Sequence, residues 1–522
     1  LIVAQSAPVD RESFIWIADT GSNPPTVSKI DTRTKLEVAR YAVGAPDPSR
    51  TSVSMNGDAY VGSRNGAGVT KISGAGKDCP DTNGDGMVTT STGPADVLPF
   101  GQDDCMLWFV KFTLPVRGVA AQDIPGQTMI EPQLEAPPVV TTTPDQHFVW
   151  VGEANPGNNA TAMAHKLDGD TGAILLSTPM PRGAYGFALD GNGMLWLTGG
   201  AYWNGSIAFI DTKQCIDAAS CNVAPCVATC SPTACPPTCD GAVKGDITLA
   251  PSSAYGITVD CKQRVWLGGY GGLIARYDHS ALADQRLMIA PAGTNGVHGI
   301  AADADGWVWG AARGRGVVRL DADTMTQSAV IPTARDAKGM AVDADGQVWV
   351  ITQGSTAHVI SPGMTVNDNS VAVDAVSGLD NPYTYSDMTG QQLVLASGGA
   401  PGSYSQVFEG CGDAKPTTWK EFIWDAETPD KTWLVFEVRS ADTLDDLDKA
   451  RWIPLAGAPS AIPTQSASIE LELMRTGEIP GKYLELRVQL NKAAGSAGKC
   501  GEVDPATPRV NALSVTHTCP PD

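Results

Sequence analysis

An acidic, glycine-rich stretch, DTNGDG at residues 81–86, has the residue types and spacing of a calcium-binding loop. Such loops place side-chain oxygens at positions 1, 3 and 5, a glycine at position 6 and a backbone carbonyl at position 7. These positions are filled in order by Asp81, Asn83, Asp85, Gly86 and Met87. We therefore expect a bound Ca²⁺ here, and the alternative is a solvated turn without an ion.

Position 12 of this EF-hand-like loop normally supplies a bidentate carboxylate, but here it is Thr92. Three nearby carboxylates could replace it: Asp96, Asp103 and Asp104. We favour Asp104, because a disulfide between Cys79 and Cys105 would return that segment to the loop. Since no flanking helices are indicated that Ca²⁺ could open, the ion is expected to be structural and not part of a sensor.

A second group of reactive side chains comprises six cysteines in residues 215–239, separated by 5, 4, 3, 4 and 3 residues. Zinc sites favour CxxC pairs or nearby histidines, which this segment lacks, so we predict a disulfide-stapled, structureless insertion. With Cys79 and Cys105 paired, seven cysteines remain up to Cys261 and three follow residue 400. Either one disulfide joins these two regions, or each keeps a free thiol.

The composition limits the compartment and the partners. Twelve cysteines indicate an oxidising compartment, so we expect a secreted or cell-surface protein. A net charge of −21 argues against nucleic acid and anionic membranes as partners. The chain has no run of about 18 apolar residues that would predict a transmembrane segment. Because it begins at Leu1 without the pattern of a signal peptide, we expect a processed or trimmed form.

A repeat organises the first three quarters of the chain. Four stretches align without gaps: AYGFALDGNGMLW (184–196), AYGITVDCKQRVW (254–266), VHGIAADADGWVW (297–309) and AKGMAVDADGQVW (337–349). Three weaker copies end at Trp16, Tyr60 and Trp150. Alternating apolar residues predict strands, and the DG and NG pairs predict tight hairpins. The period of about 40 residues is typical of a four-stranded β-propeller blade.

The pattern D-x-D/N-G-x-x-W, followed by a glycine-rich turn and a strand with R/K-x-D, resembles NHL-type propellers of secreted bacterial proteins. It is more similar to the streptogramin (virginiamycin B) lyase family. The resemblance implies a seven-bladed β-propeller over residues 1–395, with the calcium loop (74–106) and the cysteine-rich segment (213–242) inserted on one face. The half-repeat at 382–393 should supply the strand that closes the ring, and an eighth blade is the alternative.

Residues 396–522 lack the repeat and alternate short apolar strands with turns, so we predict a smaller antiparallel β-sandwich of the jelly-roll kind. The whole chain is therefore expected to be all-β. Four tryptophans of this region could form a sugar-stacking platform or pack in its core and rim: Trp419, Trp424, Trp433 and Trp452.

The face of the propeller opposite the insertions gathers the starts of the inner strands, where propeller loops converge on ligands. By register, seven residues head these strands: Gln5, Ser49, Val139, Tyr185, Tyr255, His298 and Lys338. The adjoining turns add Glu153, Trp203, Arg313, Arg315 and His358. We predict a ligand site formed by Tyr185, Tyr255, His298, Lys338 and Trp203, and the alternative is a water-filled channel.

His298 is also the one candidate for a catalytic residue. The resemblance implies an elimination that uses a metal ion, a histidine within E-x-H and a second histidine one blade earlier. His298 takes the position of the E-x-H histidine, but Gly296 replaces the glutamate and Tyr255 replaces the second histidine. We therefore do not expect this lyase activity, and GxSxG, P-loop and HExxH motifs are absent from the sequence.

The predicted function is binding or assembly at the cell surface, with a glycan or another protein as the partner. One alternative is a metal-dependent lyase or hydrolase that acts at the mouth of the channel. A second alternative is a structural subunit of an extracellular fibre.

Overall fold

The computed structural model describes most of the chain: residues 13–76, 79–124, 128–131, 139–142, 146–155, 158–199, 205–250, 254–314, 316–333, 336–390, 392, 402–412, 416–429, 432–447, 450–458, 464–492 and 508–520. The chain divides into two compact units, Leu1–Asp123 with His147–Gly398 and Ile124–Gln146 with Gly399–Asp522. The predicted boundary at residue 395 lies close to the second break. Residues 124–146 were expected in the propeller but group with the second unit.

The chain is all-β, as predicted, and its helical elements are short. They are η2 (Asn159–Thr161), α1 (Ala218–Cys221), α3 (Leu444–Leu447) and α4 (Ile469–Thr476). Among the residues that the structure describes, no helix has the length and apolar character needed to cross a bilayer.

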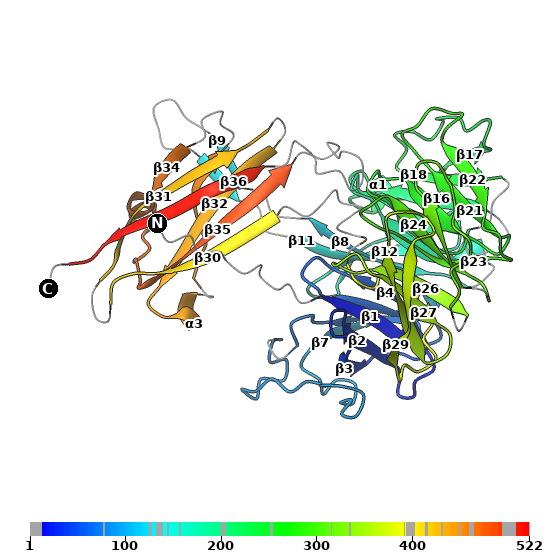
Figure 1. The fold of residues 1–522 in the computed structure, drawn as a ribbon, viewed down its shortest axis with the longest axis horizontal. Coiled ribbons are helices and arrows are strands. Elements are labelled where there is room, and N and C mark those ends of the chain that lie inside the picture. The colour runs from blue at the N-terminus through cyan, green and yellow to red at the C-terminus, as the bar shows by residue number, and fades with distance from the viewer. Residues whose placement is uncertain are drawn as a thin grey trace. The chain divides into compact units, whose positions relative to one another are not determined.

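The first unit contains, within its described residues, seven sheets of mostly antiparallel strands in chain order (Figure 1). The first three sheets are β1 (Phe14–Asp19), β2 (Thr26–Asp31) and β3 (Glu37–Ala42); β4 (Pro48–Val53), β5 (Ala59–Ser63), β6 (Gly68–Ile72) and β7 (Met106–Lys111); and β8 (Val116–Ile124), β11 (Gln146–Glu153), β12 (Met163–Asp168) and β13 (Ile174–Pro179). The fourth is β14 (Gly186–Leu189), β15 (Met194–Thr198), β16 (Ser206–Asp211), β18 (Lys244–Leu249) and β17 (Cys226–Cys230). The last three are β19 (Ile257–Val259), β20 (Val265–Gly268), β21 (Leu273–Tyr277) and β22 (Leu287–Pro291); β23 (Val297–Ala302), β24 (Trp307–Ala312) and β25 (Gly316–Asp321); and β26 (Ala337–Val342), β27 (Val348–Thr352), β28 (Thr356–Pro362) and β29 (Asn369–Ser377).

In the four copies that align without gaps, a hydrogen bond joins the repeated aspartate to the repeated tryptophan, and we call this pair the clamp. In the sheet of β23, the indole Nε1 of Trp309 donates to Asp303 Oδ2 at 2.8 Å. The other oxygen, Asp303 Oδ1, accepts the amide protons of Asp305 and Trp307. The same bond joins three further pairs, Asp190 with Trp196, Asp260 with Trp266 and Asp343 with Trp349. These carboxylates are therefore occupied in holding buried tryptophans.

A glycine at one position of three repeats, Gly256, Gly299 and Gly339, allows neighbouring inner strands to approach one another. A Cβ atom on Gly256 would lie 2.1 Å from the carbonyl oxygen of His298 in the next sheet. A Cβ on Gly299 would lie 2.6 Å from the carbonyl oxygen of Lys338. Any larger residue would push these strands apart, since contacts below 3.0 Å are essentially never observed for real Cβ atoms.

The last repeat closes the sheets into a propeller-like ring through residues 382–390, which we call the closing segment. Its Met388 carbonyl accepts the amide proton of Trp16 in β1 at 2.9 Å, and Thr384 Oγ1 accepts that of Ala18. Ser386 Oγ exchanges hydrogen bonds with the backbone of Thr51 in β4. The segment thus occupies the inner position beside β1, the place predicted for the closing strand.

The inner strand of the third sheet differs from the prediction. It is β8, which brings Arg117 to its start, whereas Val139 begins β10 (Val139–Thr142), paired with β9 (Thr128–Glu131) in the second unit. The prediction was wrong because VVTT directly precedes β11 and has the apolar, β-branched character of an inner strand. Gln5 lies outside the described residues.

Disulfides fix both insertions. Cys79 pairs with Cys105 as predicted, and three pairs staple the second insertion: Cys215–Cys221, Cys226–Cys239 and Cys230–Cys235. This insertion was expected to be structureless, but it forms α1 and β17, and β17 pairs in parallel with β18. Cys261 is also disulfide-bonded, and none of the described cysteines is free. Cys500 lies outside the described residues.

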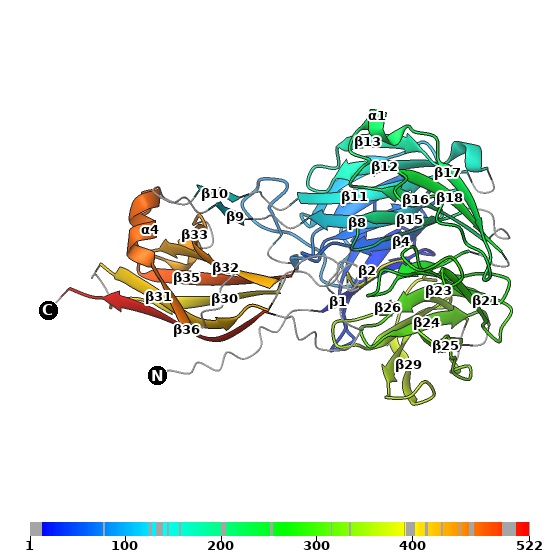
Figure 2. The ribbon, with the colours of Figure 1, turned by 90° about the horizontal axis from the view of Figure 1, so that it is seen from above.

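The second unit contains two larger antiparallel sheets that share one aromatic core. They are β30 (Gly402–Glu409), β35 (Tyr483–Lys492), β32 (Thr432–Ala441) and β33 (Ile453–Ala458); and β34 (Thr464–Ser468), β31 (Thr418–Glu427) and β36 (Arg509–Thr518). Figure 2 shows both sheets with α4, which packs against β31 and β33. A disulfide between Cys411 and Cys519 ties the two ends of this unit.

Two of the four tryptophans of the second unit lie in its core. Trp419 and Trp424 are buried in the core, and the ring centroid of Trp452 lies 4.6 and 4.2 Å from the guanidinium groups of Arg439 and Arg487. The side chain of Trp433 lies outside the described residues. Core packing is therefore the role of the first two tryptophans.

Candidate ligand-binding site at the mouth of the ring

The starts of the inner strands bring a cluster of tyrosines together. Tyr185, Tyr255 and Tyr385 are buried, with ring centroids of Tyr255 at 5.0 Å from Tyr185 and 4.9 Å from Tyr385. Tyr270 and Tyr383 pack against them and are half-buried. The hydroxyl groups of Tyr255 and Tyr383 are hydrogen-bonded. These rings form one aromatic cluster at the ends where the inner strands begin.

A buried arginine lies among these tyrosines. Arg50 in β4 is 1% exposed, and its guanidinium group lies 3.5 Å from the ring centroid of Tyr385 and 5.1 Å from that of Tyr185. It donates to the carbonyl of Ser49 at 2.8 Å and to the Tyr385 hydroxyl. No carboxylate of the described residues forms an ion pair with it. Burial raises the pKa of Tyr185, but the positive charge of Arg50 and hydrogen bonds from neighbouring tyrosines leave that pKa below its ordinary value.

His298 lies beside Lys338 at the same end of the ring. Its ring atom Nδ1 is 3.3 Å from Lys338 Nζ, while Nε2 is buried and has no hydrogen-bond partner among the described residues. Burial, followed by the charge of Lys338, lowers the pKa of His298 to about 4. The imidazole is therefore neutral at physiological pH. Lys338 Nζ also lies 3.4 Å from Asp336.

The outer layer of the site comes from turns between the second and third strands of several sheets. Arg313, in the turn after β24, is exposed, and its guanidinium lies 5.4 Å from the ring centroid of Tyr270. Arg64, in the turn after β5, lies 4.6 Å from the ring centroid of Tyr383 and pairs with Asp47. We call the surface formed by Tyr270, Tyr383, Arg64, Arg313 and Lys338 the mouth.

Sequence reasoning found part of this site. Four of the five predicted ligand residues lie together: Tyr185, Tyr255, His298 and Lys338. Trp203 and Arg315 lie outside the described residues. His358 was expected in a turn of this face but is fully buried within β28, where its Nδ1 accepts the amide proton of Asp374.

Several residues of the site were missed by the sequence analysis, namely Arg50, Arg64, Arg117, Tyr270, Tyr383 and Tyr385. A signal was present for two of them, because Tyr383 and Tyr385 head the half-repeat that was expected to close the ring. Arg117 could not be assigned while Val139 was expected to begin the third inner strand.

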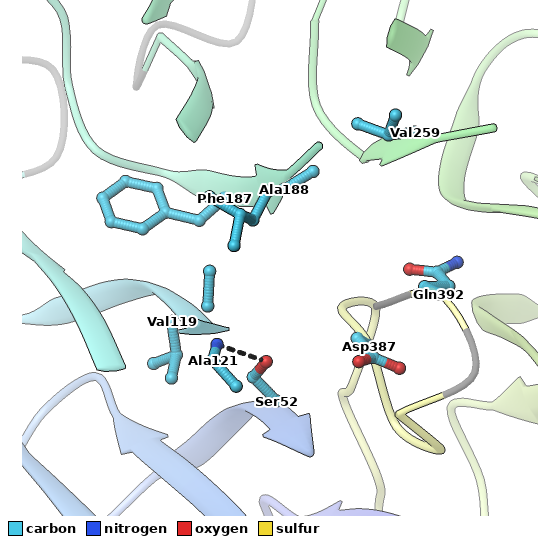
Figure 3. A pocket seen from close by; sticks show the side chains of 10 residues that line it. Ser52, Val119, Ala121, Phe187, Ala188, Val259, Asp387 and Gln392 are labelled. Atoms are coloured by element: carbon cyan, nitrogen blue, oxygen red, sulfur yellow. Dashed lines mark hydrogen bonds between the residues drawn. The ribbon is translucent and has the colours of Figure 1, made fainter. Parts of the chain in front are cut away.

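A small cavity lies between the inner strands (Figure 3). Its volume is about 30 Å³, room for one or two water molecules. Side chains from β4, β8, β14 and β19 line it, together with Asp387 of the closing segment and Gln392. Asp387 accepts the amide protons of Thr389 and Gly390, and burial raises its pKa to about 6.

The expected calcium loop has the local hydrogen bonds of a tight turn. Asp81 accepts the amide protons of Gly84 and Gly86, and Asn83 accepts that of Asp85. Gly86 has φ of +87°, which suits glycine at the sixth position. These residues fit a Ca²⁺ ligand set in type and order.

The three candidates for the bidentate carboxylate are each engaged with backbone or hydroxyl donors of the insertion. Asp104 accepts the amide protons of Thr82 and Thr89, which hold its pKa below the ordinary value. Asp96 bonds to Thr92, and Asp103 bonds to Ser91. Among the described residues, only Cys411, His517 and Cys519 bring three potential metal-ligating atoms within 4.8 Å of one another, and two of these form a disulfide. The Asp104 carboxylate lies against the loop, where it also accepts the amide proton of Asn83 at 3.3 Å.

Comparison with known proteins gives partial structural likenesses only. No family model and no curated protein matches the chain. A functionally unknown protein from Desulfotomaculum acetoxidans DSM 771 shares 12% identity and a TM-score of 0.44, with 70% of this chain and 98% of that chain covered. A protein from Lactobacillus plantarum shares 14% identity and a TM-score of 0.45, with 72% of this chain and 98% of that chain covered. A streptogramin B lyase shares 16% identity and a TM-score of 0.39, with 65% of this chain and 86% of that chain covered. At these values the matches carry no inference about activity.

Proposed function

We propose that this chain is an extracellular binding protein in which the seven sheets of the first unit are seven propeller blades and the mouth holds a glycan. The observation that carries the proposal is the pair of half-buried tyrosines, Tyr270 and Tyr383, each with an arginine close to its ring. Aromatic faces pack against the C–H faces of sugars, and a few polar groups around them bind hydroxyls. Twelve cysteines and their disulfides support an extracellular location.

A binding role accounts for His298 better than the alternative lyase or hydrolase does. The imidazole is 1% exposed, and its Nδ1 faces the ammonium group of Lys338. Proton abstraction needs a base within reach of the substrate and an electrophile for the developing charge. Gly296 carries no side chain at the position where the lyase resemblance requires the acidic ligand. His298 therefore supports the floor of the mouth in this proposal.

The proposal is tested by a glycan array followed by calorimetry with the full-length protein. We expect binding of at least one saccharide, with Tyr270→Ala and Tyr383→Ala each weakening it at least about tenfold, as for loss of an aromatic stacking contact. Tyr483→Ala is the matched control, since this half-buried tyrosine also has a lysine near its ring but lies in the second unit. An array without hits, or binding that all three variants retain, would refute glycan recognition at the mouth.

We also propose that residues 81–87 hold a structural Ca²⁺ through Asp81, Asn83, Asp85 and the carbonyl of Met87, after a movement that lets Asp104 join them. Since an ion that binds only the folded state stabilises it, EDTA should lower the melting temperature of the intact chain. Asp81→Asn should reduce this effect, whereas Asp170→Asn, in an exposed turn, should leave it unchanged. Identical melting curves with EDTA and with excess CaCl₂ would contradict the proposal.

A further inference from the structure

We infer that the ligand at the mouth is an anionic saccharide, one that carries carboxylate or sulfate groups. This inference rests on the proposed function and names the class of glycan. It follows from the balance of charges and of hydrogen-bond donors at this end of the ring.

Cations outnumber carboxylates at the mouth and directly beneath it. Five positively charged side chains lie there: Arg50, Arg64, Arg117, Arg313 and Lys338. The carboxylates that contact them among the described residues are Asp47, which pairs with Arg64, and Asp336, which pairs with Lys338. This local surplus of positive charge contrasts with the chain as a whole, whose net charge is −21. A cationic site on an acidic protein attracts anions selectively.

The buried positive charge of Arg50 is energetically unfavourable when no anion is bound. Arg50 is 1% exposed, the groups around it are tyrosine rings and hydroxyls, and no carboxylate of the described residues forms an ion pair with it. Burying a charge without a partner of opposite sign is strongly unfavourable. An anion bound above the tyrosine cluster would offset this charge through a region of low dielectric constant, where electrostatic attraction is stronger than in water.

The buried donors of the site also lack acceptors. Nε of Arg50, Nε of Arg117 and Nε2 of His298 are buried and have no hydrogen-bond partner among the described residues. Nδ1 of His298 lies 3.3 Å from Lys338 Nζ and 3.4 Å from the carbonyl oxygen of Ala337. The two guanidinium Nε atoms are donors in every state of the protein. Carboxylate and sulfate groups are rich in acceptors and bring the negative charge that water does not.

The test measures binding of the intact protein to three polysaccharides by calorimetry: polygalacturonate for carboxylates, dextran sulfate for sulfates, and unmodified dextran as the neutral ligand. We expect at least about tenfold tighter binding to one of the two anionic polymers than to dextran. This binding should weaken several-fold between about 20 and 200 mM NaCl, since salt screens the attraction between charges at the protein surface. The anionic polymer that binds more tightly identifies the preferred group.

Two substitutions separate charge recognition from misfolding. Arg313→Gln changes an exposed side chain and should weaken anionic binding about fivefold to tenfold and reduce its salt dependence. Arg33→Gln is the control, because this exposed arginine pairs with Asp345 in the turn between β26 and β27. Tighter binding to a neutral saccharide, or binding independent of salt and of Arg313, would overturn the anionic class and leave glycan binding intact. Failure of every polymer here and of every saccharide on the array would overturn both.

Discussion

Asp387 offers a direct test of the cavity at the centre of the ring. Its carboxyl group faces this cavity, its Oδ1 accepts two backbone amide protons, and burial raises its pKa to about 6 from an ordinary value of 3.8. Replacing it by asparagine keeps the accepting oxygen and removes the ionisation. Asp387→Asn should therefore stabilise the protein wherever the wild-type carboxylate is charged.

The size of the effect follows from the pKa difference. Because the folded pKa is raised, the native state keeps its proton longer than the unfolded state, and stability is lost as pH rises from about 4 to about 6. A shift of about 2 units corresponds to roughly 3 kcal/mol. The Asp387→Asn variant should match the wild type near pH 4 and exceed its free energy of unfolding by up to about 3 kcal/mol at pH 7. For a unit of this size, that difference raises the melting temperature by about 4 °C.

The assay is denaturant unfolding of both proteins at pH 4 and pH 7, followed by tryptophan fluorescence. Other titrating groups are common to both proteins, so their effects cancel in the difference between variant and wild type. A difference that is equal at the two pH values would show that Asp387 does not titrate with a raised pKa. A variant less stable at pH 7 would show that its second oxygen makes an essential contact as a carboxylate.

Two further predictions concern the repeat itself. Gly339→Ala should destabilise the first unit by roughly 2 kcal/mol or more, because its Cβ would lie 1.9 Å from the carbonyl oxygen of Thr384. Gly93→Ala is the control, since a Cβ there has no atom within 4 Å, and thermal melts should show no change in its stability. Asp303→Ala should lower the free energy of unfolding in urea by roughly 2–3 kcal/mol, because it leaves the buried indole N–H of Trp309 without an acceptor. An equal loss of stability in Asp305→Ala, which changes an exposed residue, would argue against the role of the Asp303–Trp309 bond.

The repeat could be predicted from the sequence because its hairpins are stabilised by contacts between residues that are close in sequence. The aspartate, glycine and tryptophan of one hairpin lie within a few residues of one another, as Asp303 and Trp309 show. The predicted site was partly readable for the same reason, since Tyr255, His298 and Lys338 occupy one position of the repeat. Residues at the same position of successive repeats are therefore expected to lie close together around the axis of the ring.

The remaining parts depend on contacts between residues far apart in sequence. Arg50 has no unusual neighbours in the sequence, and its role appears only when Tyr385, 335 residues away, lies against it. The third inner strand was misplaced because an insertion separates β8 from β11, and composition alone does not distinguish β8 from β10. The orientation of Asp104 likewise depends on which amides of the folded insertion reach its carboxylate.

The closing segment also determines when the first unit can be completed during synthesis. The amide of Ala18 bonds to Thr384, 366 residues later in the chain, so β1 has an unpaired edge until almost four hundred residues have emerged. Contacts of such long sequence separation form slowly, and an exposed strand edge invites pairing with other chains. A chain truncated before the closing segment should therefore form an open array of sheets that associates with other copies of itself. During synthesis, the same exposed edge should require chaperones until the closing segment has been made.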